Sequence, residues 1–533
     1  MPLFIGLAMA AGMLLGATFF RPSSNDPQAT AKGYLKFREI LSYIDREYVD
    51  TVNTEELSEY AISKMLEKLD PHSSYIPARE LGLAKSYLES DFDGIGVEFN
   101  IFRDTLYVIA PVHDGPSEQV GIQAGDKIIK VDGESLTGEK LTNEKVFQKL
   151  RGPRGSKVNL TILRRGEAKP KQFTVVRRKI PTVSVDVGYM VDDKTGYIKV
   201  SRFASSTYDE FKKKLTALRK QGMQRLILDL RDNPGGYLDH ATRMADEFIA
   251  GNKKLVYTDG KGEKYDADYY ARTKGEFENG DLVVLINEGS ASASEILAGA
   301  LQDHDRAVIV GRRSFGKGLV QVPIPLSDGG ELRLTISRYY TPSGRSIQKP
   351  YDPNDAEEYE MDIMNRFKHG EFFSQDSIRF NDSLKYQTEH GRTVYGGGGI
   401  MPDVFVPRDT TEYTELLSEL YRKNVLREYA VNYFRDNRAR LQKMPFSEFK
   451  ASFQVTDPML QDLLKDAKRA GITVKDDELK RSQRTIRNNV KAFVARSVYD
   501  SNGFYPILNE VDPDFQRALG AFDLAKQISL GKK

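Results

Sequence analysis

The strongest constraint on the fold is the stretch of residues 281–322, in which an apolar run that suits a strand is followed by a turn and a helix. Residues 281–287, DLVVLIN, contain a continuous apolar run whose length and Val, Leu and Ile content suit a buried strand. A Glu-Gly turn and three alternating serines follow, and residues 295–303 suit a helix. A strand-to-helix turn offers free N–H groups at the helix N-terminus, where an oxyanion can be held. The stretch therefore predicts an α/β fold with an anion-stabilising turn.

Serine and lysine side chains occupy two points of this stretch. Ser290, Ser292 and Ser294 alternate with alanines, and Lys317 lies between two glycines after a second apolar run, residues 307–313. The structural interpretation is that serines cap helices and that a lysine between glycines is a solvated turn residue. The chemical interpretation is a hydroxyl nucleophile activated by a neighbouring base. These residues alone leave both interpretations open.

Three ordered motifs resemble those of the carboxy-terminal processing peptidases, also called tail-specific proteases. The motifs are DLR-N-PGG at 229–236, GSASASEI-AGALQD at 289–303 and GRRSFGKGLVQ at 311–321. The resemblance implies that Ser292 is the nucleophile and that Lys317, 25 residues later, is the base. It also implies that Gln321 completes the site.

The segment upstream of the serines predicts a second wall for this site. Residues 196–236 read as strand, helix, strand and a tight Pro-Gly-Gly turn. Ligands gather at the carboxyl ends of such strands, so the turn should face the same crevice as the serines. The resemblance implies an oxyanion hole made by the N–H groups of Ala293 and of Gly235 or Gly236. Asp232 in the turn is interpreted as a solvated cap.

Residues 179–408 are assigned to an α/β protease core, which by resemblance is related to the crotonase-like and tail-specific protease folds. Residues 319–347 predict a hairpin that turns at Asp328-Gly329-Gly330. Residues 350–388 are acidic, aromatic and without a regular pattern. We interpret them as an insertion over the sheet.

Residues 91–178 resemble a PDZ domain, with short strands and the phrase GIQAGDKIIKVDG. Gly94, Ile95, Gly96 and Val97 occupy the position of a carboxylate-binding loop, in which glycines let several N–H groups converge on a chain-terminal carboxylate. The following strand would offer an open edge to a peptide. Arg151, at the end of the expected groove helix, is a candidate for communication with the protease core.

Two regions outside these domains are helical in pattern. Residues 21–90 comprise a polar linker up to Thr30 and a helical region that ends at the turn containing His72, which we interpret as a turn residue. Residues 409–533 form a helical C-terminal domain with apolar stripes. Core packing or a homodimer interface would each explain these stripes.

Residues 1–20 are assigned to a membrane anchor or signal segment. Residues 3–20 form an uncharged run at the lower length limit for a membrane-spanning helix. Without a small-x-small cleavage site after it, an uncleaved anchor is favoured. Arg21 by itself favours a cytoplasmic location for the rest of the chain, whereas the resemblance implies export of the catalytic part to the periplasmic side of the cell envelope.

Composition narrows the classes of partner and cofactor. The 78 Lys and Arg residues balance the 76 Asp and Glu residues, so nothing indicates a nucleic-acid partner. The chain has no Cys, which excludes disulfides and a cysteine nucleophile. The six histidines are scattered without metal-ligand spacing. We expect neither a metal nor a cofactor.

The function expected from these observations is a serine endopeptidase that selects exported proteins through their free C-terminal tails. Two alternatives remain. One is a PDZ-bearing adaptor with an inactive protease fold. The other is a serine hydrolase in which His240 or His304 is the base.

Overall fold

The computed structural model describes residues 27–531 except 103, 113, 139–140, 165–166, 168 and 380. Residues 3–20, for which a membrane anchor is predicted, lie outside the described residues. Among the described residues, no helix is long and apolar enough to cross a membrane. Helices α2 (Pro27–Glu47) and α3 (Thr54–Glu67) belong to a unit that ends at Leu69, and the chain from Asp70 forms a second compact unit. The linker predicted up to Thr30 is too long, because α2 already begins at Pro27, a residue suited to the first helical turn.

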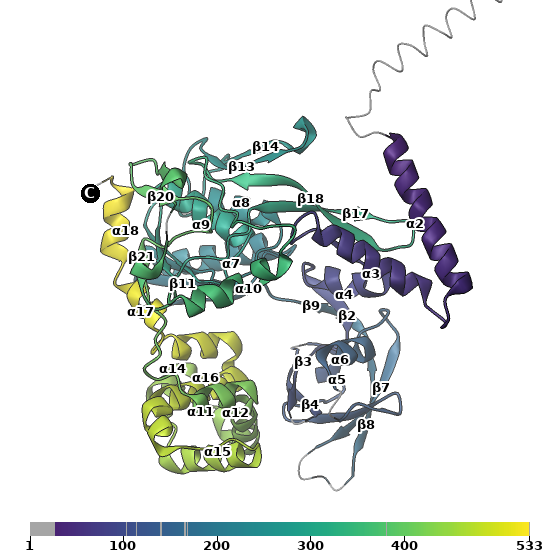
Figure 1. Ribbon diagram of the computed structural model, residues 1–533. Coiled ribbons are helices and arrows are strands. Elements are labelled where there is room, and N and C mark those ends of the chain that lie inside the picture. The colour runs from purple at the N-terminus through teal and green to yellow at the C-terminus, as the bar shows by residue number, and fades with distance from the viewer. Residues whose placement is uncertain are drawn as a thin grey trace, which may run out of the picture. The chain divides into compact units, whose positions relative to one another are not determined.

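A six-stranded sheet forms the middle of the second unit (Figure 1). Its first two strands are antiparallel and the remaining neighbours are parallel. In spatial order the strands are β10 (Val185–Met190), β11 (Thr195–Val200), β12 (Arg225–Asp229), β15 (Asp281–Ile286), β16 (Val308–Gly311) and β21 (Val404–Phe405).

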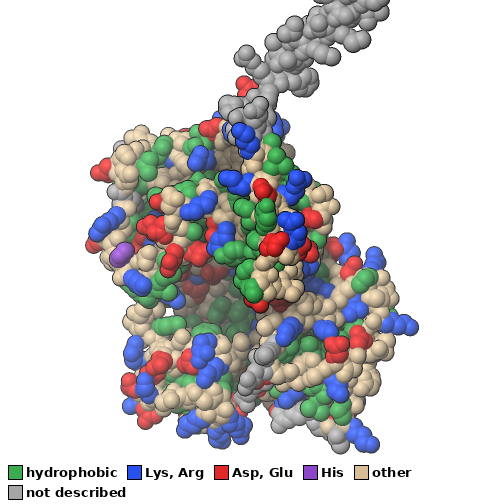
Figure 2. Space-filling model, turned by 45° about the vertical axis from the view of Figure 1, so that its right-hand side comes forward, with side chains coloured by type: hydrophobic (Ala, Val, Ile, Leu, Met, Phe, Trp, Pro, Cys, Tyr) green, Lys and Arg blue, Asp and Glu red, His purple; other side chains and the backbone are tan. Residues whose placement is uncertain are grey.

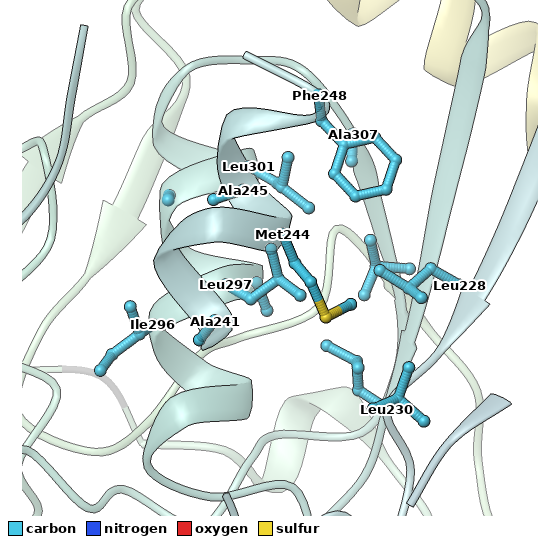
Figure 3. Close-up of a cluster of buried hydrophobic side chains, with 14 of the residues drawn as sticks. Leu228, Leu230, Ala241, Met244, Ala245, Phe248, Ile296, Leu297, Leu301 and Ala307 are labelled. Carbon is cyan, nitrogen blue, oxygen red and sulfur yellow. The ribbon is translucent and has the colours of Figure 1, made fainter. Parts of the chain in front are cut away.

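Both faces of this sheet are covered by helices, which explains the uninterrupted apolar run of β15. Val284 faces a cluster shared with α7 (Thr207–Lys220), α8 (Leu238–Asp246) and α9 (Ala293–Asp303), whereas Val283 faces a cluster on the opposite side. Figure 3 shows α8 and α9 packed together through Met244, Leu297 and their neighbours. The buried α9 fixes the direction of the strand-to-helix turn before it.

A second sheet of five strands carries the predicted hairpin. Strand β18 (Glu331–Tyr340) pairs with β17 (Leu319–Pro325) around the turn predicted at residues 328–330, which confirms the hairpin. The other strands are β1 (Ser74–Ile76), β13 (Lys254–Gly260) and β14 (Ala267–Tyr270). A short helix, α4 (Ala78–Ser86), follows β1.

The segment of residues 350–388 is more regular than predicted. It contains α10 (Ala356–Lys368), whose first turn is capped by the Asp355 side chain. The prediction that this segment lacks regular structure was wrong, because its apolar pattern is too weak to indicate a helix. The helix has instead an acidic first turn and a basic last turn, which stabilise it. A two-stranded ribbon follows, made by β19 (Lys385–Gln387) and β20 (Thr393–Tyr395).

The region assigned to a PDZ domain forms its own antiparallel sheet, with β3 (Val97–Phe102) at one edge. A ribbon of β2 (Asp91–Gly94) and β9 (Arg178–Pro181) joins this region to the core. Helices α5 (Pro116–Gln119) and α6 (Asn143–Leu150) accompany the sheet. Its remaining strands are β4 (Thr105–Pro111), β5 (Lys127–Val131), β6 (Glu134–Ser135), β7 (Lys157–Leu163) and β8 (Lys171–Val176).

The C-terminal helices divide into two groups. The first group buries its apolar stripes in a shared core, as one of the two interpretations of these stripes expects. This group comprises α11 (Glu415–Arg422), α12 (Val425–Asp436), α13 (Arg438–Leu441), α14 (Phe446–Ser452), α15 (Asp457–Arg469) and α16 (Asp476–Leu508).

The last two helices depart from the predicted single C-terminal domain. Helices α17 (Pro513–Leu519) and α18 (Phe522–Ser529) cover the second face of the central sheet, where Phe515 and Phe522 contact its apolar side chains. The predicted helices are present, but a helical pattern carries no information on which surface its apolar stripe covers.

Candidate active site

The structure separates the three serines of the strand-to-helix turn. Ser290 and Ser294 are fully buried, and their hydroxyls donate to Leu230 O and Asn233 O at 2.8 and 2.9 Å. Both therefore tie the turn after β12 to the turn after β15. Ser292 alone remains partly exposed. A hydroxyl at this position can meet a substrate.

Ser292 occupies the N-cap position of α9 but lacks the backbone of an ordinary cap. Its φ and ψ are 54° and −114°, whereas N-cap residues usually adopt the β region. A non-glycine residue held there stores about 1–3 kcal/mol of strain, and such strain clusters at functional sites. The conformation favours the chemical interpretation of Ser292 over the structural one.

The Pro-Gly-Gly turn lies directly against Ser292, as its position after β12 predicts. Gly235 has a φ of +100°, and a Cβ at this residue would lie 2.8 Å from Ser292 Cβ and 2.9 Å from Ala293 N. Only glycine fits this close approach. The Gly235 N–H donates to Asn233 Oδ1 at 2.9 Å.

Two N–H groups beside Ser292 remain available. In the described part of the chain, Ala293 N and Gly236 N make no hydrogen bond to another group of the protein. Gly236 is also exposed, whereas Gly235 is buried. Of the two glycines considered for the oxyanion hole, Gly236 therefore has the free donor.

Asp232 is exposed, and its carboxylate accepts from Asn287 Nδ2 at 2.8 Å.

Lys317 precedes β17 on a loop flanked by Gly316 and Gly318. Burial lowers the pKa of its ammonium; the Glu295 carboxylate opposes this shift, and the Arg333 guanidinium adds to it. Among the described residues, no hydrogen-bond or ion-pair partner reaches its Nζ. A largely buried amine without a counter-ion loses its proton more readily than a solvated one.

Glu295 is a site residue whose contacts the sequence did not reveal. Its fully buried carboxylate accepts from Ser292 N at 2.8 Å and from Lys317 N at 2.9 Å through the same oxygen, Oε2. Its other oxygen accepts from Gly316 N and from the Ser314 hydroxyl. Burial raises the pKa of Glu295 to about 7, against these four hydrogen bonds. The serine and lysine loops thus meet on one side chain.

Gln321 lies on β17, four residues beyond Lys317. Its Nε2 donates to Thr335 Oγ1 at 3.0 Å, and Thr335 Oγ1 donates to Asp70 Oδ1 at 3.0 Å. The structure thus joins Gln321 to the turn at Asp70, a link that sequence spacing does not encode. It shows no hydrogen bond between Gln321 and the Lys317 amine within the described chain.

His72 lies in the turn where it was predicted, close enough to Lys317 for the lysine charge to affect its pKa. Burial lowers its pKa to about 4, and the nearby Lys317 charge adds to this shift. Its Nε2 lies 2.8 Å from the Tyr359 hydroxyl on α10. His72 is therefore neutral at neutral pH.

The two histidines considered as alternative bases are occupied elsewhere. His304 ends α9, the 11-residue helix that Ser292 begins, and such a helix is about 16 Å long. Its Nε2 lies 2.7 Å from Lys254 O. His240 Nδ1 accepts from Tyr208 N at 3.2 Å on α7. Neither histidine contacts Ser292, so the structure disfavours the Ser-His alternative.

The predicted carboxylate-binding loop lies at the open edge of the PDZ-like sheet. Gly96 has a φ of +68°, which favours glycine, and a Cβ there would lie 2.9 Å from Ile180 Cδ1. Ile95 is buried, and its carbonyl accepts from the Ser117 hydroxyl at 2.6 Å. Gly94 ends β2 and Val97 begins β3, whose outer edge is unpaired within the described sheet.

Arg151 lies at the C-terminus of α6, between the PDZ-like region and α4. Its guanidinium stacks on Phe92 and Phe147, 4.4 and 4.5 Å from the ring centroids, and donates to Ser86 Oγ at 2.7 Å. The arginine thus bridges the groove helix to a segment outside that region.

No group of acidic or histidine residues in the described chain has an arrangement that could hold a metal ion. On the face shown in Figure 2, basic and acidic side chains are interspersed, in keeping with a formal net charge of +2.

Comparison with known families and proteins gives three matches along the chain. Residues 194–356 match the model of peptidase family S41, and residues 107–164 match a PDZ domain. Residues 416–500, which include most of α11–α16, match a family of unknown function, DUF8443. The first two matches confirm the predicted kinds of domain.

The chain covers most of the length of its curated relatives. A carboxy-terminal-processing protease of Bartonella bacilliformis is 38% identical over 64% of this chain and 78% of the relative. The carboxy-terminal processing protease CtpB of Bacillus subtilis is 33% identical over 72% of this chain and 79% of the relative. A solved photosystem II D1 C-terminal processing protease is 27% identical over 71% of this chain and 94% of its own, with a TM-score of 0.36. Since curated relatives at more than 30% identity are covered over more than two thirds of their length, the chain belongs to peptidase family S41, the carboxy-terminal processing proteases.

Proposed function

We propose that this protein is a serine endopeptidase in which Ser292 and Lys317 form a catalytic dyad. The observation that carries the proposal is the contact of both residues with one carboxylate oxygen of Glu295, which brings the serine turn and the lysine loop together. The lowered pKa of Lys317 and the two free N–H groups beside Ser292 support the same chemistry.

In the proposed reaction, neutral Lys317 takes the proton of the Ser292 hydroxyl as the oxygen attacks the scissile carbonyl. The N–H groups of Ala293 and Gly236 stabilise the oxyanion, and Lys317 returns the proton to the leaving amine. Water then hydrolyses the acyl-enzyme with the lysine again as base. General-base catalysis typically contributes about 10²–10⁴-fold, and removal of one oxyanion donor typically costs about 10²–10³-fold in rate. For Gln321 to orient the amine in this scheme, its side chain has to turn from Thr335 towards Lys317; as an amide it adds no negative charge that would hold the proton on the lysine.

The PDZ domain is proposed to select substrates by a free, apolar C-terminus. The tail would lie along the unpaired edge of β3 with its carboxylate at residues 94–97. Arg151, which joins α6 to Ser86, would transmit tail binding to the core. This role would explain why a half-buried, positively charged side chain is placed between the two regions.

The cellular setting is part of the proposal. Residues 3–20 would anchor the protein in the membrane with the catalytic part on the periplasmic side of the cell envelope, where its substrates are exported proteins. A homodimer through the C-terminal helices would have to use their outward side chains, such as Tyr421, because the apolar stripes are buried.

The proposal is tested with an unfolded protein substrate that ends in an apolar free C-terminus. We expect Ser292→Ala and Lys317→Ala each to abolish cleavage, while His240→Ala and His304→Ala retain it. Amidation of the substrate's C-terminus should raise KM, and Arg151→Ala should weaken the response to the tail. A Lys317→Ala enzyme with wild-type activity would exclude the dyad. If neither the wild-type protein nor Ser292→Ala cleaves the substrate, but both bind its C-terminal tail, the result favours the adaptor alternative.

A further inference from the structure

The serine of the proposed dyad lies in the turn before the buried α9, whereas the lysine lies on a loop flanked by two glycines. Ser292 has a positive φ in the turn between β15 and α9. Lys317 is flanked by Gly316, with a φ of +91°, and by Gly318. Because glycine leaves the backbone free, the position of Lys317 relative to Ser292 must be held by other groups.

Tyr339 contacts the carbonyl groups of both residues. Its hydroxyl lies 2.6 Å from Lys317 O and 3.2 Å from Ser292 O, so one O–H is shared between two acceptors. Ser292 O already accepts from two N–H groups of α9, and the shorter bond goes to Lys317. The Tyr339 ring is 1% exposed within the core cluster, and its own N–H donates to Gly318 O at 3.0 Å.

Glu295 makes the complementary contacts with the N–H groups. Its Oε2 accepts from Ser292 N and Lys317 N, and the side chain belongs to the first turn of the buried α9. Two side chains from two rigid elements, α9 and β18, therefore hold all four main-chain polar groups of Ser292 and Lys317.

We propose that Tyr339 and Glu295 act as positioning residues that clamp the backbones of Ser292 and Lys317 together. Neither side chain reacts. The clamp keeps the two reacting side chains within reach while the substrate carbonyl passes through its tetrahedral state. This inference rests on the proposed function, since it assigns these residues to the same dyad.

The clamp predicts a loss of rate without a loss of substrate binding. Tyr339→Phe removes one oxygen atom, which leaves Lys317 O without this donor and lets the lysine loop move. A displacement of about 1 Å at a reacting group can cost about 10²-fold in rate. We expect kcat to fall about 10- to 100-fold, with KM within about twofold of wild type. The rate at which a fluorophosphonate probe labels Ser292 should fall in parallel.

Tyr340→Phe is the matched control. Tyr340 is the next residue of β18, but its ring stacks on Tyr257 at 5.0 Å, away from the proposed dyad. The same loss of a hydroxyl there should leave kcat unchanged. All rates are normalised to folded protein, measured by circular dichroism below the melting transition, so that a purely structural role would leave the rate per folded molecule unaltered.

The pH profile distinguishes the two halves of the clamp. The charges acting on Lys317 are those of Glu295, Arg333 and Asp70, and the Glu295 charge raises the lysine pKa. A base is active above its pKa, so Glu295→Gln should shift the rising limb of the rate profile to lower pH while it lowers the maximum. Tyr339→Phe removes no charge and should leave the limb in place.

The outcomes separate this inference from the proposed function. Hydrogen exchange in a peptide that contains Lys317 should be faster in Tyr339→Phe and unchanged in Tyr340→Phe. If Ser292→Ala and Lys317→Ala are inactive but Tyr339→Phe cleaves at the wild-type rate, the clamp is wrong and the dyad stands. If Tyr339→Phe does not fold, Glu295→Gln tests the N–H side alone, and a wild-type rate there also overturns the clamp. Activity in Lys317→Ala would instead reject the dyad.

Discussion

At the scale of the residue, the site depends on positions where only one side chain fits. Gly235 packs against Ser292 Cβ and the free N–H of Ala293, so a methyl group there would enter the space proposed for the oxyanion. Its φ of +100° adds backbone strain for any other residue. Steric exclusion and strain therefore act at the same position and can be separated by experiment.

Gly235→Ala should lower kcat by at least about 10²-fold, because loss of one oxyanion donor typically costs about 10²–10³-fold. Gly251→Ala is the matched control, since Gly251 has a similar positive φ of +82° and a Cβ there would have no atom of the described residues within 4 Å. Both variants carry backbone strain, but only the first blocks the site. Steady-state kinetics and thermal unfolding of both proteins check the prediction, and equal kcat values would contradict it.

At the scale of the element, α10 contacts the segment that leads into Lys317 and its flanking glycines, the lysine loop. The buried Arg366 donates to Arg313 O and Ser314 O, at 2.8 and 2.9 Å, and to the Glu371 carboxylate at 2.8 Å. These carbonyls shortly precede Gly316 and Lys317. The helix that sequence patterning missed thus supports the part of the site that has the least local stiffness.

Arg366→Met should destabilise the protein by about 3–5 kcal/mol, the usual cost of breaking a buried ion pair by removing one partner. It should also lower kcat, since two buried carbonyls of the lysine loop lose their donor. Lys368→Met on the same helix is the control, because Lys368 is exposed and its change should stay within about 0.5 kcal/mol. Denaturant unfolding and peptidase assays test both. A stable, fully active Arg366→Met protein would show that α10 does not support the loop.

At the scale of the whole molecule, α12 of the C-terminal helices contacts the PDZ domain. Val431 of α12 is buried with Phe102, Tyr107 and Ile109 of β3 and β4. Beside this cluster, Glu98 pairs with Arg427 at 2.5 Å and with Arg496 at 3.1 Å. The charged side chains are 24–40% exposed, whereas Val431 is 2% exposed. The apolar cluster should therefore contribute most of the stabilisation.

Val431→Asp should separate the two regions, because an unpaired carboxylate is costly in an apolar cluster. Glu98→Gln should change stability by about 1 kcal/mol, at the upper end of the range for surface ion pairs, because these side chains are partly exposed. Limited proteolysis and hydrogen exchange of β3 and β4 report the separation. Faster hydrogen exchange in Glu98→Gln than in Val431→Asp would show that the ion pairs, and not the apolar cluster, contribute most of the stabilisation. If the PDZ domain moves on tail binding, Val431→Asp should also raise cleavage of substrates without a free tail.

Much of the architecture could be predicted because it is encoded locally. The apolar run of β15, the turn of the β17–β18 hairpin and the ordered motifs at 229–236, 289–303 and 311–321 are all readable along the chain. Helix α10 and the linker boundary at Pro27 were missed, since weak periodicity does not define a helix by itself. The covering of the central sheet by α17 and α18 was also missed, because an apolar stripe does not name its partner.

Motifs that resemble those of the family, with their spacing and periodicity, indicate along the chain the family, the kinds of domain and the order of the proposed site residues. Contacts among the described residues show which serine keeps a partly exposed hydroxyl, which glycine N–H lacks a partner, and which side chains join Ser292 to Lys317. These features depend on hydrogen bonds between segments that are distant in the sequence. The Ser294 hydroxyl donates to Asn233 O, Lys317 N donates to the Glu295 carboxylate, and the Tyr339 hydroxyl donates to Lys317 O. Each of these bonds forms only when the sheets and helices have packed.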